Sequence, residues 1–316
     1  MLNFKVKYLR AAYFLTKNYL KNYPSFAALE LMGTCNNNCP YCSFAGLSNG
    51  QKDLADDDWY HIVDEFIKRG VISFSFIGRE PFLRKDLLFK LIHRVRNKAI
   101  TGVVTNGILV TSEDIIQMKE LGLDYFQLSV HSLKDLQRNL DLTIEARKIG
   151  LVASLSMVVY SKNMNLWRKL IKACQDNEII FNFCLCQQLK NSQTTSYLIK
   201  DIISPSDLNE VLTHANELFR TNPGLIRNSR KYINSLKNSL WHCDPEIFAR
   251  LHINYRGEFN ACTAFNTGVL FEDWVKYQVE AIKVRRSCQG CNYACEMDFA
   301  SLSNVVRDIF RVSIRQ

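Results

Sequence analysis

The chain has 316 residues, of which 47% are hydrophobic, so it can bury a sizeable core in one large domain with a smaller one beside it. Its net charge of +9 raises the question of nucleic-acid binding, but the basic stretch 227–237 contains Tyr232 as its one aromatic and carries no specific nucleic-acid signal. No apolar run reaches the length of a bilayer span or of a signal peptide. We therefore expect a cytoplasmic protein, in which eleven cysteines indicate metal ligands rather than disulfides.

The first 24 residues carry five basic side chains and no acidic one. Wound as a helix, they place four of the basic residues beside an apolar stripe made of Leu2, Val6, Leu9, Tyr13 and Leu20. In the interpretation that we favour, the stripe packs on the rest of the protein and the lysines lie in water. In the alternative, the helix lies on an anionic membrane surface and the protein is peripheral to the membrane.

Short apolar runs alternate with helical patterns over residues 25–222, which is typical of repeated βα units and a parallel sheet. The predicted strands are Phe26–Met32, Ile72–Ile77, Gly102–Thr105, Tyr125–Val130, Val152–Tyr160 and Ile179–Cys186. Between them, one predicted helix opens at residues 56–58 and ends at Gly70, and another opens at Ser112 and stops at Gly122. Six such units predict an α/β fold, a partial (β/α)6 TIM-like barrel, with a boundary near residues 222–224 and a smaller unit over 223–316.

Strand alternation assigns the two faces of the predicted sheet. If Phe126 and Leu128 face the outer helices, then Gln127, Ser129 and His131 face the lumen. The same alternation turns further polar residues and thiols inward, namely Glu30, Ser73, Ser75, Ser154, Ser156, Asn182, Cys184 and Cys186. Polar groups from five strands are costly there unless water or a polar ligand satisfies them. We therefore expect an open cavity whose substrate contacts come from Glu30, Gln127, His131 and Asn182.

The densest chemical signal is the run 35–42, Cys-Asn-Asn-Asn-Cys-Pro-Tyr-Cys. Its cysteines, Cys35, Cys39 and Cys42, offer a 4Fe-4S cluster three thiolates and leave one iron open, whereas electron-carrier clusters are normally held by four. A zinc knuckle is the alternative, but zinc signatures usually pair two short Cys or His repeats, and no His follows at ligand spacing. The spacing, with Tyr41 before the last Cys, resembles the radical S-adenosylmethionine (SAM) superfamily.

The resemblance extends over residues 25–300 and includes positions beyond the cysteines. The run Gly-Arg-Glu-Pro at 78–81 is similar to the Gly-Gly-Glu-Pro turn of that family, which implies that Gly78 and Glu80 hold the SAM amine. Arg79 stands where the family has a second Gly, and that departure bears on the backbone of the turn. At successive strand ends, further SAM contacts are implied for Thr105 and Asn106, for Ser129 at the ribose, and for Tyr41 beside the adenine.

A second group of cysteines follows in the C-terminal part of the chain: Cys243, Cys262, Cys288, Cys291 and Cys295. Their arrangement resembles the twitch or SPASM extension of radical SAM enzymes, which binds auxiliary 4Fe-4S clusters. A predicted hairpin over 251–262, turning at Arg256-Gly257, fits its small β element. Five cysteines suffice for one cluster, with Cys243, Cys262 and Cys288 as the firmest ligands and Cys291 favoured over Cys295 as the fourth. A zinc ribbon is the alternative.

The resemblance implies an enzyme that takes an electron from a donor such as flavodoxin or ferredoxin and cleaves SAM to a 5′-deoxyadenosyl radical. From the polar lumen we expect a polar small-molecule substrate, sugar-like or amino-acid-like, and we favour its oxidation. Epimerisation is the alternative, with a hydrogen-donating thiol from Cys184, Cys186 or the spare Cys291 or Cys295. Further alternatives are modification of a lipid headgroup or a peptide, and a non-catalytic iron-sulfur or zinc protein that binds RNA.

Overall fold

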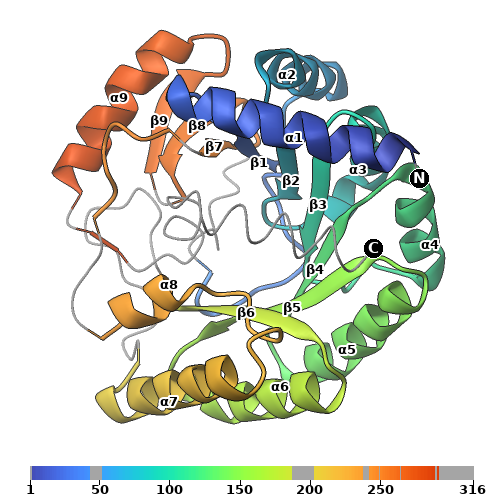
Figure 1. Cartoon of the computed structure of the whole chain (residues 1–316), viewed down its shortest axis with the longest axis vertical. Helices are drawn as coiled ribbons and strands as arrows, with labels where there is room; N and C mark the ends of the chain where they lie inside the picture. The colour runs from blue at the N-terminus through green and yellow to red at the C-terminus, as the bar shows by residue number, and fades with distance from the viewer. Residues whose placement is uncertain are drawn as a thin grey trace.

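The computed structural model describes residues 2–42, 52–186, 203–237, 242–248, 250–263, 265–288 and 290–291. In this part of the chain, helices lie along the outside of a curved sheet (Figure 1). The strands are β1 (Phe26–Glu30), β2 (Ser73–Ile77), β3 (Ile100–Thr105), β4 (Tyr125–Ser129), β5 (Val152–Val159), β6 (Ile180–Leu185), β7 (Arg250–Ile253), β8 (Glu258–Cys262) and β9 (Phe265–Leu270). The helices are α1 (Leu2–Leu20), α2 (Asp56–Arg69), α3 (Lys85–Val95), α4 (Ser112–Leu121), α5 (Leu133–Lys148), α6 (Met164–Asp176), α7 (Pro205–Thr221), α8 (Arg230–Ser235) and α9 (Trp274–Ser287).

Strands β1 to β6 are parallel and follow one another in the sheet in chain order. Parallel neighbours need a crossover connection, and α2 to α6 provide the five crossovers on the outside of the arc (Figure 1). Each predicted strand is found, with ends that differ by at most two residues. The α/β fold with a partial barrel of six βα units is therefore confirmed. Its geometry brings the carboxyl ends of all six strands to one edge.

The predicted faces of the strands are confirmed where the burial pattern alternates. On β4, Phe126 and Leu128 are fully buried against the helices, whereas Gln127 and Ser129 are half-buried on the opposite, inner face. On β6, Phe181 and Phe183 pack against the ring of Trp167, with ring centroids 6.0 and 4.9 Å apart. Each such buried aromatic contributes roughly 1.5–3 kcal/mol of transfer free energy, so a register slip that exposed them would be costly.

Helix ends follow the predicted punctuation closely. Gly70 and Gly122 cap the carboxyl ends of α2 and α4 as expected. The amino-terminal cap of α4 is Thr111 rather than Ser112, because the Thr111 side chain accepts a hydrogen bond from the backbone N–H of Asp114 at 3.3 Å. None of the described helices is long and apolar enough to cross a membrane.

The amino-terminal helix α1 packs on the protein, while two residues of the stripe predicted for it are exposed. Tyr13 and Leu20 of that stripe are 62% and 79% exposed. The buried side is offset by part of a turn, and it packs against the start of β1 and the residue before β2 through Ala11, Leu15, Phe26 and Ile72. Asn18 adds a 2.8 Å hydrogen bond to the backbone oxygen of Gly70, next to the end of α2. The prediction was wrong for Tyr13 and Leu20, because amphipathic spacing alone does not fix how a short helix rotates on its support.

The C-terminal hairpin is found where the sequence predicts it, with β7 antiparallel to β8. It also continues the main sheet, since β7 lies parallel to β1 with Leu29 opposite Ile253. Residues on the two sides of the expected boundary at 222–224 also pair, because Ile226 forms an isolated β-bridge with Phe181 on β6. A division into residues 25–222 and 223–316 stays a prediction, and across the described residues the sheet runs through both parts (Figure 1).

Candidate active site

The loop after β1 carries the three cysteines of the first group at the carboxyl edge of the barrel. The backbone N–H of Cys42 donates to the carbonyl oxygen of Cys39 at 3.0 Å, and the sulfur of Cys35 accepts from the N–H of Asn37 at 3.4 Å. The ten cysteines within the described residues are all outside disulfides, as expected for metal ligands.

Electrostatics show that the first-group thiols are close neighbours. Burial, and then the charges of Cys42 and Cys35, raise the pKa of Cys39 to about 12. Burial also raises the pKa of Cys35. Among the described residues, no three His, Cys, Asp or Glu side chains are gathered tightly enough to hold a metal ion. The fit to an iron-sulfur cluster therefore rests on donor chemistry: three thiols on one short loop whose charges would need a cationic partner.

The turn over residues 78–81 packs directly on β1. Gly78 has a φ of +91°, and a Cβ added there would lie 2.4 Å from the Cβ of Glu30, so only Gly fits this approach. Arg79 also has a positive φ, +47°, which strains a residue with a side chain. Its guanidinium stacks 4.9 Å from the ring centre of Tyr255, in the β7–β8 turn. The residue that departs from the family motif thus joins the C-terminal hairpin to the barrel.

Glu80 is fully buried and holds two strand ends together. Its carboxylate accepts hydrogen bonds from the N–H of Phe82 (3.0 Å), the hydroxyl of Thr105 (2.7 Å) and the N–H of Asn106 (2.9 Å). Burial nevertheless raises the pKa of the Glu80 carboxyl above its usual range. Glu80 and Thr105, both expected at SAM, therefore make contacts within the protein that stabilise this edge. Their contact with SAM stays a prediction.

Asn106 connects that edge to the cysteine loop. Its side-chain amide donates to Asn36 at 2.7 Å and lies 3.9 Å from the sulfur of Cys35. Its carbonyl oxygen accepts from Asn139 and from Arg138, both at 3.1 Å. The loop, β3 and the start of α5 are therefore tied through one residue, and Asn106 is suited to position Cys35.

Tyr41 lies between the cysteine loop and the ends of β4 and β5. Its hydroxyl is hydrogen-bonded to the Nδ1 of His131, and its ring lies 5.5 Å from that of Tyr160. Burial, followed by the charge of Cys39, raises the pKa of Tyr41, and burial lowers the pKa of His131. His131 thus contacts Tyr41. The two side chains form one wall beside the cysteine loop.

Polar side chains form two rows across β4, β5 and β6. In the outer row, the hydroxyls of Ser129 and Ser156 are 3.2 Å apart, and Asn182 lies opposite Ser156 on β6. The Oδ1 of Asn182 is buried and has no hydrogen-bond partner in the described part of the chain. In the row below, Tyr125 bonds to Gln127 and Ser154. The outer row therefore retains an acceptor for a ligand, while Gln127 is partly satisfied within the protein.

The two strand cysteines flank this wall at the end of β6. Cys184 is half-buried and lies near enough to Tyr41 for its charge to raise the pKa of Tyr41. Cys186 is buried, which raises the pKa of its thiol to about 11, and it lies near Tyr160. The Cys186 thiol therefore remains protonated at neutral pH, and both cysteines lie on the side of the cysteine loop.

The second cysteine group is dispersed over several elements. Cys262 ends β8, Cys288 follows α9, and Cys243 precedes β7. The N–H of Gly290 donates to the sulfur of Cys288 at 3.4 Å, and the nearby Cys291 is buried. Cys295 lies outside the described residues. An auxiliary cluster at these thiols stays a prediction.

Sequence reasoning missed His252. Its Nε2 lies 2.7 Å from the Oε1 of Glu30, and both side chains are 4% exposed. Glu30 was expected to contact substrate but instead contacts this imidazole. Alternation within the predicted hairpin was the available signal, because Leu251 and Ile253 face the core and therefore turn His252 to the inner face.

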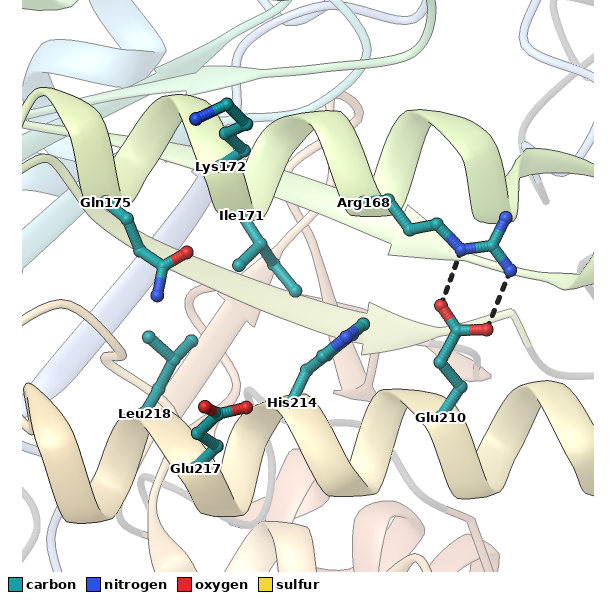
Figure 2. A pocket seen from close by; sticks show the side chains of 8 residues that line it. All are labelled: Arg168, Ile171, Lys172, Gln175, Glu210, His214, Glu217 and Leu218. Carbon is teal, nitrogen blue, oxygen red and sulfur yellow. Dashed lines mark hydrogen bonds and ion pairs between the residues drawn. The ribbon is translucent and has the colours of Figure 1, made fainter.

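A separate cavity of about 330 Å³ lies between α6 and α7, in the outer helical layer (Figure 2). Arg168 and Glu210 bridge it with two hydrogen bonds of 2.7 Å. The other lining residues are Ile171, Lys172, Gln175, His214, Glu217 and Leu218. No predicted site residue lines it, so it does not belong to the site at the strand ends.

Comparison with known proteins gives a family match for the barrel part of the chain. A family model described as the radical SAM superfamily matches residues 29–164, which include the cysteine loop, the 78–81 turn and the ends of β3 and β4. This part of the chain is similar to the radical SAM superfamily, as the sequence predicted. Its cofactors are therefore a 4Fe-4S cluster and SAM. The match favours a cluster of this kind over a zinc knuckle at residues 35–42 and over a non-catalytic RNA-binding protein.

Two similar proteins are PqqA peptide cyclases. That of Granulibacter bethesdensis is 28% identical over 159 residues, which cover 46% of this chain and 42% of the relative. That of Rhodopseudomonas palustris is 26% identical over 162 residues, covering 47% and 43%. The match thus spans less than half the length of these curated relatives.

Solved structures agree with the fold. SuiB of Streptococcus suis bound to S-adenosylmethionine has a TM-score of 0.63 at 17% identity, covering 89% of this chain and 75% of that one. The anSMEcpe structure with bound AdoMet and Cp18Cys peptide has a TM-score of 0.62 at 16% identity, covering 93% and 100%. At these identities the likeness shows the fold.

Proposed function

We propose that this protein is a radical SAM enzyme that oxidises a side chain of a peptide, with loss of two hydrogens. The observation that carries the proposal is the meeting of the cysteine loop, the 78–81 turn and the Ser129–Ser156–Asn182 row at one edge of the sheet. Relatives named as peptide cyclases, and a neighbour solved with a peptide, favour a peptide over the small molecule expected from the sequence.

The residues of the carboxyl edge divide the work between them. Cys35, Cys39 and Cys42 would hold the catalytic cluster, which together with SAM supplies the 5′-deoxyadenosyl radical. Asn106 and Glu80 hold the loop and the strand ends at fixed separations, so they position rather than react. An external one-electron donor, of the flavodoxin or ferredoxin type, would reduce the site.

SAM and substrate would share the inner face of β4, β5 and β6. The Ser129 and Ser156 hydroxyls suit the two ribose hydroxyls, because each can donate and accept. The buried Oδ1 of Asn182 offers an acceptor to an N–H or O–H of either ligand. Tyr41 and His131 close one side and exclude water from the radical.

The second cysteine group would serve the electron balance of the oxidation. Cys243, Cys262, Cys288 and Cys291 supply enough thiols for one auxiliary cluster, which would accept the electron left after hydrogen abstraction. Cys295 is the alternative to Cys291. This role distinguishes oxidation from epimerisation, which needs a hydrogen donor instead of an electron acceptor.

Epimerisation is the second candidate reaction, favoured by Cys184 and Cys186 beside the cysteine loop. Burial raises the pKa of Cys186 to about 11, so that thiol keeps the hydrogen that a donor requires. In deuterated water, an epimerase would place one solvent deuterium in a product of unchanged formula. Cys184→Ser or Cys186→Ser would then convert turnover into abortive SAM cleavage. We expect an oxidase, which survives both changes with modest loss.

The decisive experiment offers the reconstituted protein two substrate pools under anaerobic conditions, with SAM and a chemical reductant. One is a pool of synthetic random-sequence peptides and the other a pool of sugars and free amino acids. We expect 5′-deoxyadenosine together with peptides that are two hydrogens lighter by mass spectrometry. Products from the second pool alone would move the substrate back to a polar small molecule. Absence of 5′-deoxyadenosine would refute the activity itself.

A further inference from the structure

A buried acid–imidazole pair lies on the inner face of the sheet on the side opposite β4 to β6. Glu30 ends β1, and His252 lies on the neighbouring strand β7, where it pairs with Ala28. Their 2.7 Å contact is made by two side chains that are each 4% exposed. Burying either group alone would be costly, so each stabilises the other.

The pair leaves one ring nitrogen available. With Glu30 as the carboxylate, Nε2 donates to it and carries the proton of the neutral imidazole, which leaves Nδ1 as an acceptor. Nδ1 is buried and has no hydrogen-bond partner among the described residues. An unsatisfied buried acceptor costs about 1–3 kcal/mol, which indicates that a donor binds there.

Asn260 extends this patch on β8. The hairpin register, with Ile253 opposite Phe259, places His252 opposite Asn260, so both side chains lie on one face. The Oδ1 of Asn260 is also buried and lacks a partner in the described part of the chain. Two unpartnered acceptors side by side suit a hydroxyl, thiol or N–H group of a ligand.

The patch borders the turn assigned to SAM. Gly78 approaches Glu30 so closely that an added Cβ would lie 2.4 Å from the Glu30 Cβ. Arg79, the next residue, stacks on Tyr255 at the end of the same hairpin. The His252 imidazole contacts Glu30, and Glu30 packs against Gly78 of the 78–81 turn. The radical would form beside that turn.

We propose that His252 is the proton acceptor of the oxidation and that Glu30 is its positioning residue. The inference rests on the proposed function and adds the group that takes the proton. Hydrogen-atom abstraction from a carbon bearing an O–H, N–H or S–H group leaves a carbon radical. His252 Nδ1 takes the proton of that group while Glu30 stabilises the imidazolium.

The hydrogen atoms and electrons removed in a two-hydrogen oxidation are then all accounted for. One hydrogen atom would go to the radical that SAM supplies when bound, and His252 would take one proton and pass it to solvent. One electron goes to a one-electron acceptor of the iron-sulfur class, and the substrate carbon gains a double bond to its oxygen, nitrogen or sulfur. Removing the proton makes the radical strongly reducing, so proton loss enables the electron transfer.

The turnover test uses His252→Ala with the peptide pool. We expect 5′-deoxyadenosine to form still, while the yield of peptides two hydrogens lighter falls about 100-fold. Added imidazole should restore part of that yield, which a merely structural defect would not allow. His214→Ala, on the outer helix α7, is the matched control and should behave as the wild type. Unchanged product yield in both His252→Ala and Glu30→Gln overturns the proposal.

A substrate-free arm separates this proposal from the peptide assignment. Nitrogen-15 NMR of histidine-labelled protein, with the cluster oxidised, reports which ring nitrogen of His252 carries the proton. An unprotonated Nδ1 that loses this preference in Glu30→Gln supports the pair, and a protonated Nδ1 in the wild type refutes it. If the wild type cleaves SAM but makes no lighter peptide, the peptide assignment fails. The NMR result alone then tests the Glu30–His252 pair.

Discussion

The two cysteine groups of this chain are built in opposite ways. Residues 35–42 come from one loop directly after β1 and are held to the barrel through Asn106. The described cysteines of the second group come from separate elements, with Cys262 at the end of β8 and Cys288 at the end of α9. A local group depends on chain spacing, whereas a dispersed group exists only once β8 has paired with β7 and α9 has packed on it. The two groups should therefore fail independently when their ligands are removed.

The largest effect is expected from removing the local group. Changing Cys35, Cys39 and Cys42 together to Ala should abolish 5′-deoxyadenosine formation, because no iron remains to bind SAM. The iron content of the anaerobically reconstituted protein should fall from two clusters to one. Loss of all iron would show that the dispersed group does not bind a cluster by itself. The two groups would then not be independent.

Removing the dispersed group should separate SAM cleavage from product formation. We expect Cys262→Ala to retain 5′-deoxyadenosine formation while the oxidised product disappears, because the electron acceptor is lost. Cys174→Ala is the control, since Cys174 is a fully buried core thiol on α6 and both clusters should remain. Iron analysis and mass spectrometry measure the two outcomes. A Cys262→Ala protein that forms the full yield of product would remove the auxiliary cluster from the reaction.

Glu80→Gln tests whether the barrel edge acts through its internal hydrogen bonds. The NH₂ group of the introduced amide would face one of the three N–H or O–H groups from which the carboxylate accepts. The free energy of unfolding should therefore fall by about 1–3 kcal/mol, and the affinity for SAM should fall with it. The raised pKa of Glu80 means that the folded state holds the proton more tightly than the unfolded state. Its stabilising contribution is therefore complete below pH 4.5, the usual pKa, and is lost as pH rises through the folded-state pKa.

Urea unfolding at several pH values checks this prediction. The gap between wild type and Glu80→Gln should narrow as pH rises above 4.5, whereas the exposed control Glu120→Gln should follow the wild type. Weaker SAM binding without any loss of stability would contradict the internal role and favour direct contact with the SAM amine.

The smallest effect is expected where the two regions meet. Arg79→Ala loses the ring contact with Tyr255 but keeps the strained φ of +47°. Arg79→Gly loses the same contact and removes the strain, so it should be more stable than Arg79→Ala by about 1 kcal/mol. Comparison of urea midpoints measures the difference. Equal midpoints would mean that the backbone at Arg79 is not under strain.

Much of the barrel could be predicted from local patterns. The alternation of Phe126 and Leu128 with Gln127 and Ser129 depends on side chains two residues apart, so the sequence shows it directly as a two-residue hydrophobic period. The three-cysteine loop is similarly local. By contrast, the burial of Tyr13 and Leu20 on α1 failed as a prediction, because the partner surface that buries Ala11 and Leu15 is not encoded by the helix itself.

The sequence by itself predicted the six βα units, the three-cysteine loop with its resemblance to the radical SAM superfamily, and the hairpin at 251–262, since each rests on spacing within a short segment. Only the tertiary structure decided what Glu80 and Glu30 contact. Glu80, which the sequence predicts at SAM, accepts hydrogen bonds from groups at the end of β3 and beside it. Glu30 meets His252 across 222 residues of chain. That contact exists because β7 pairs with β1, and strand pairing over such a separation is set by the closure of the whole sheet rather than by either segment.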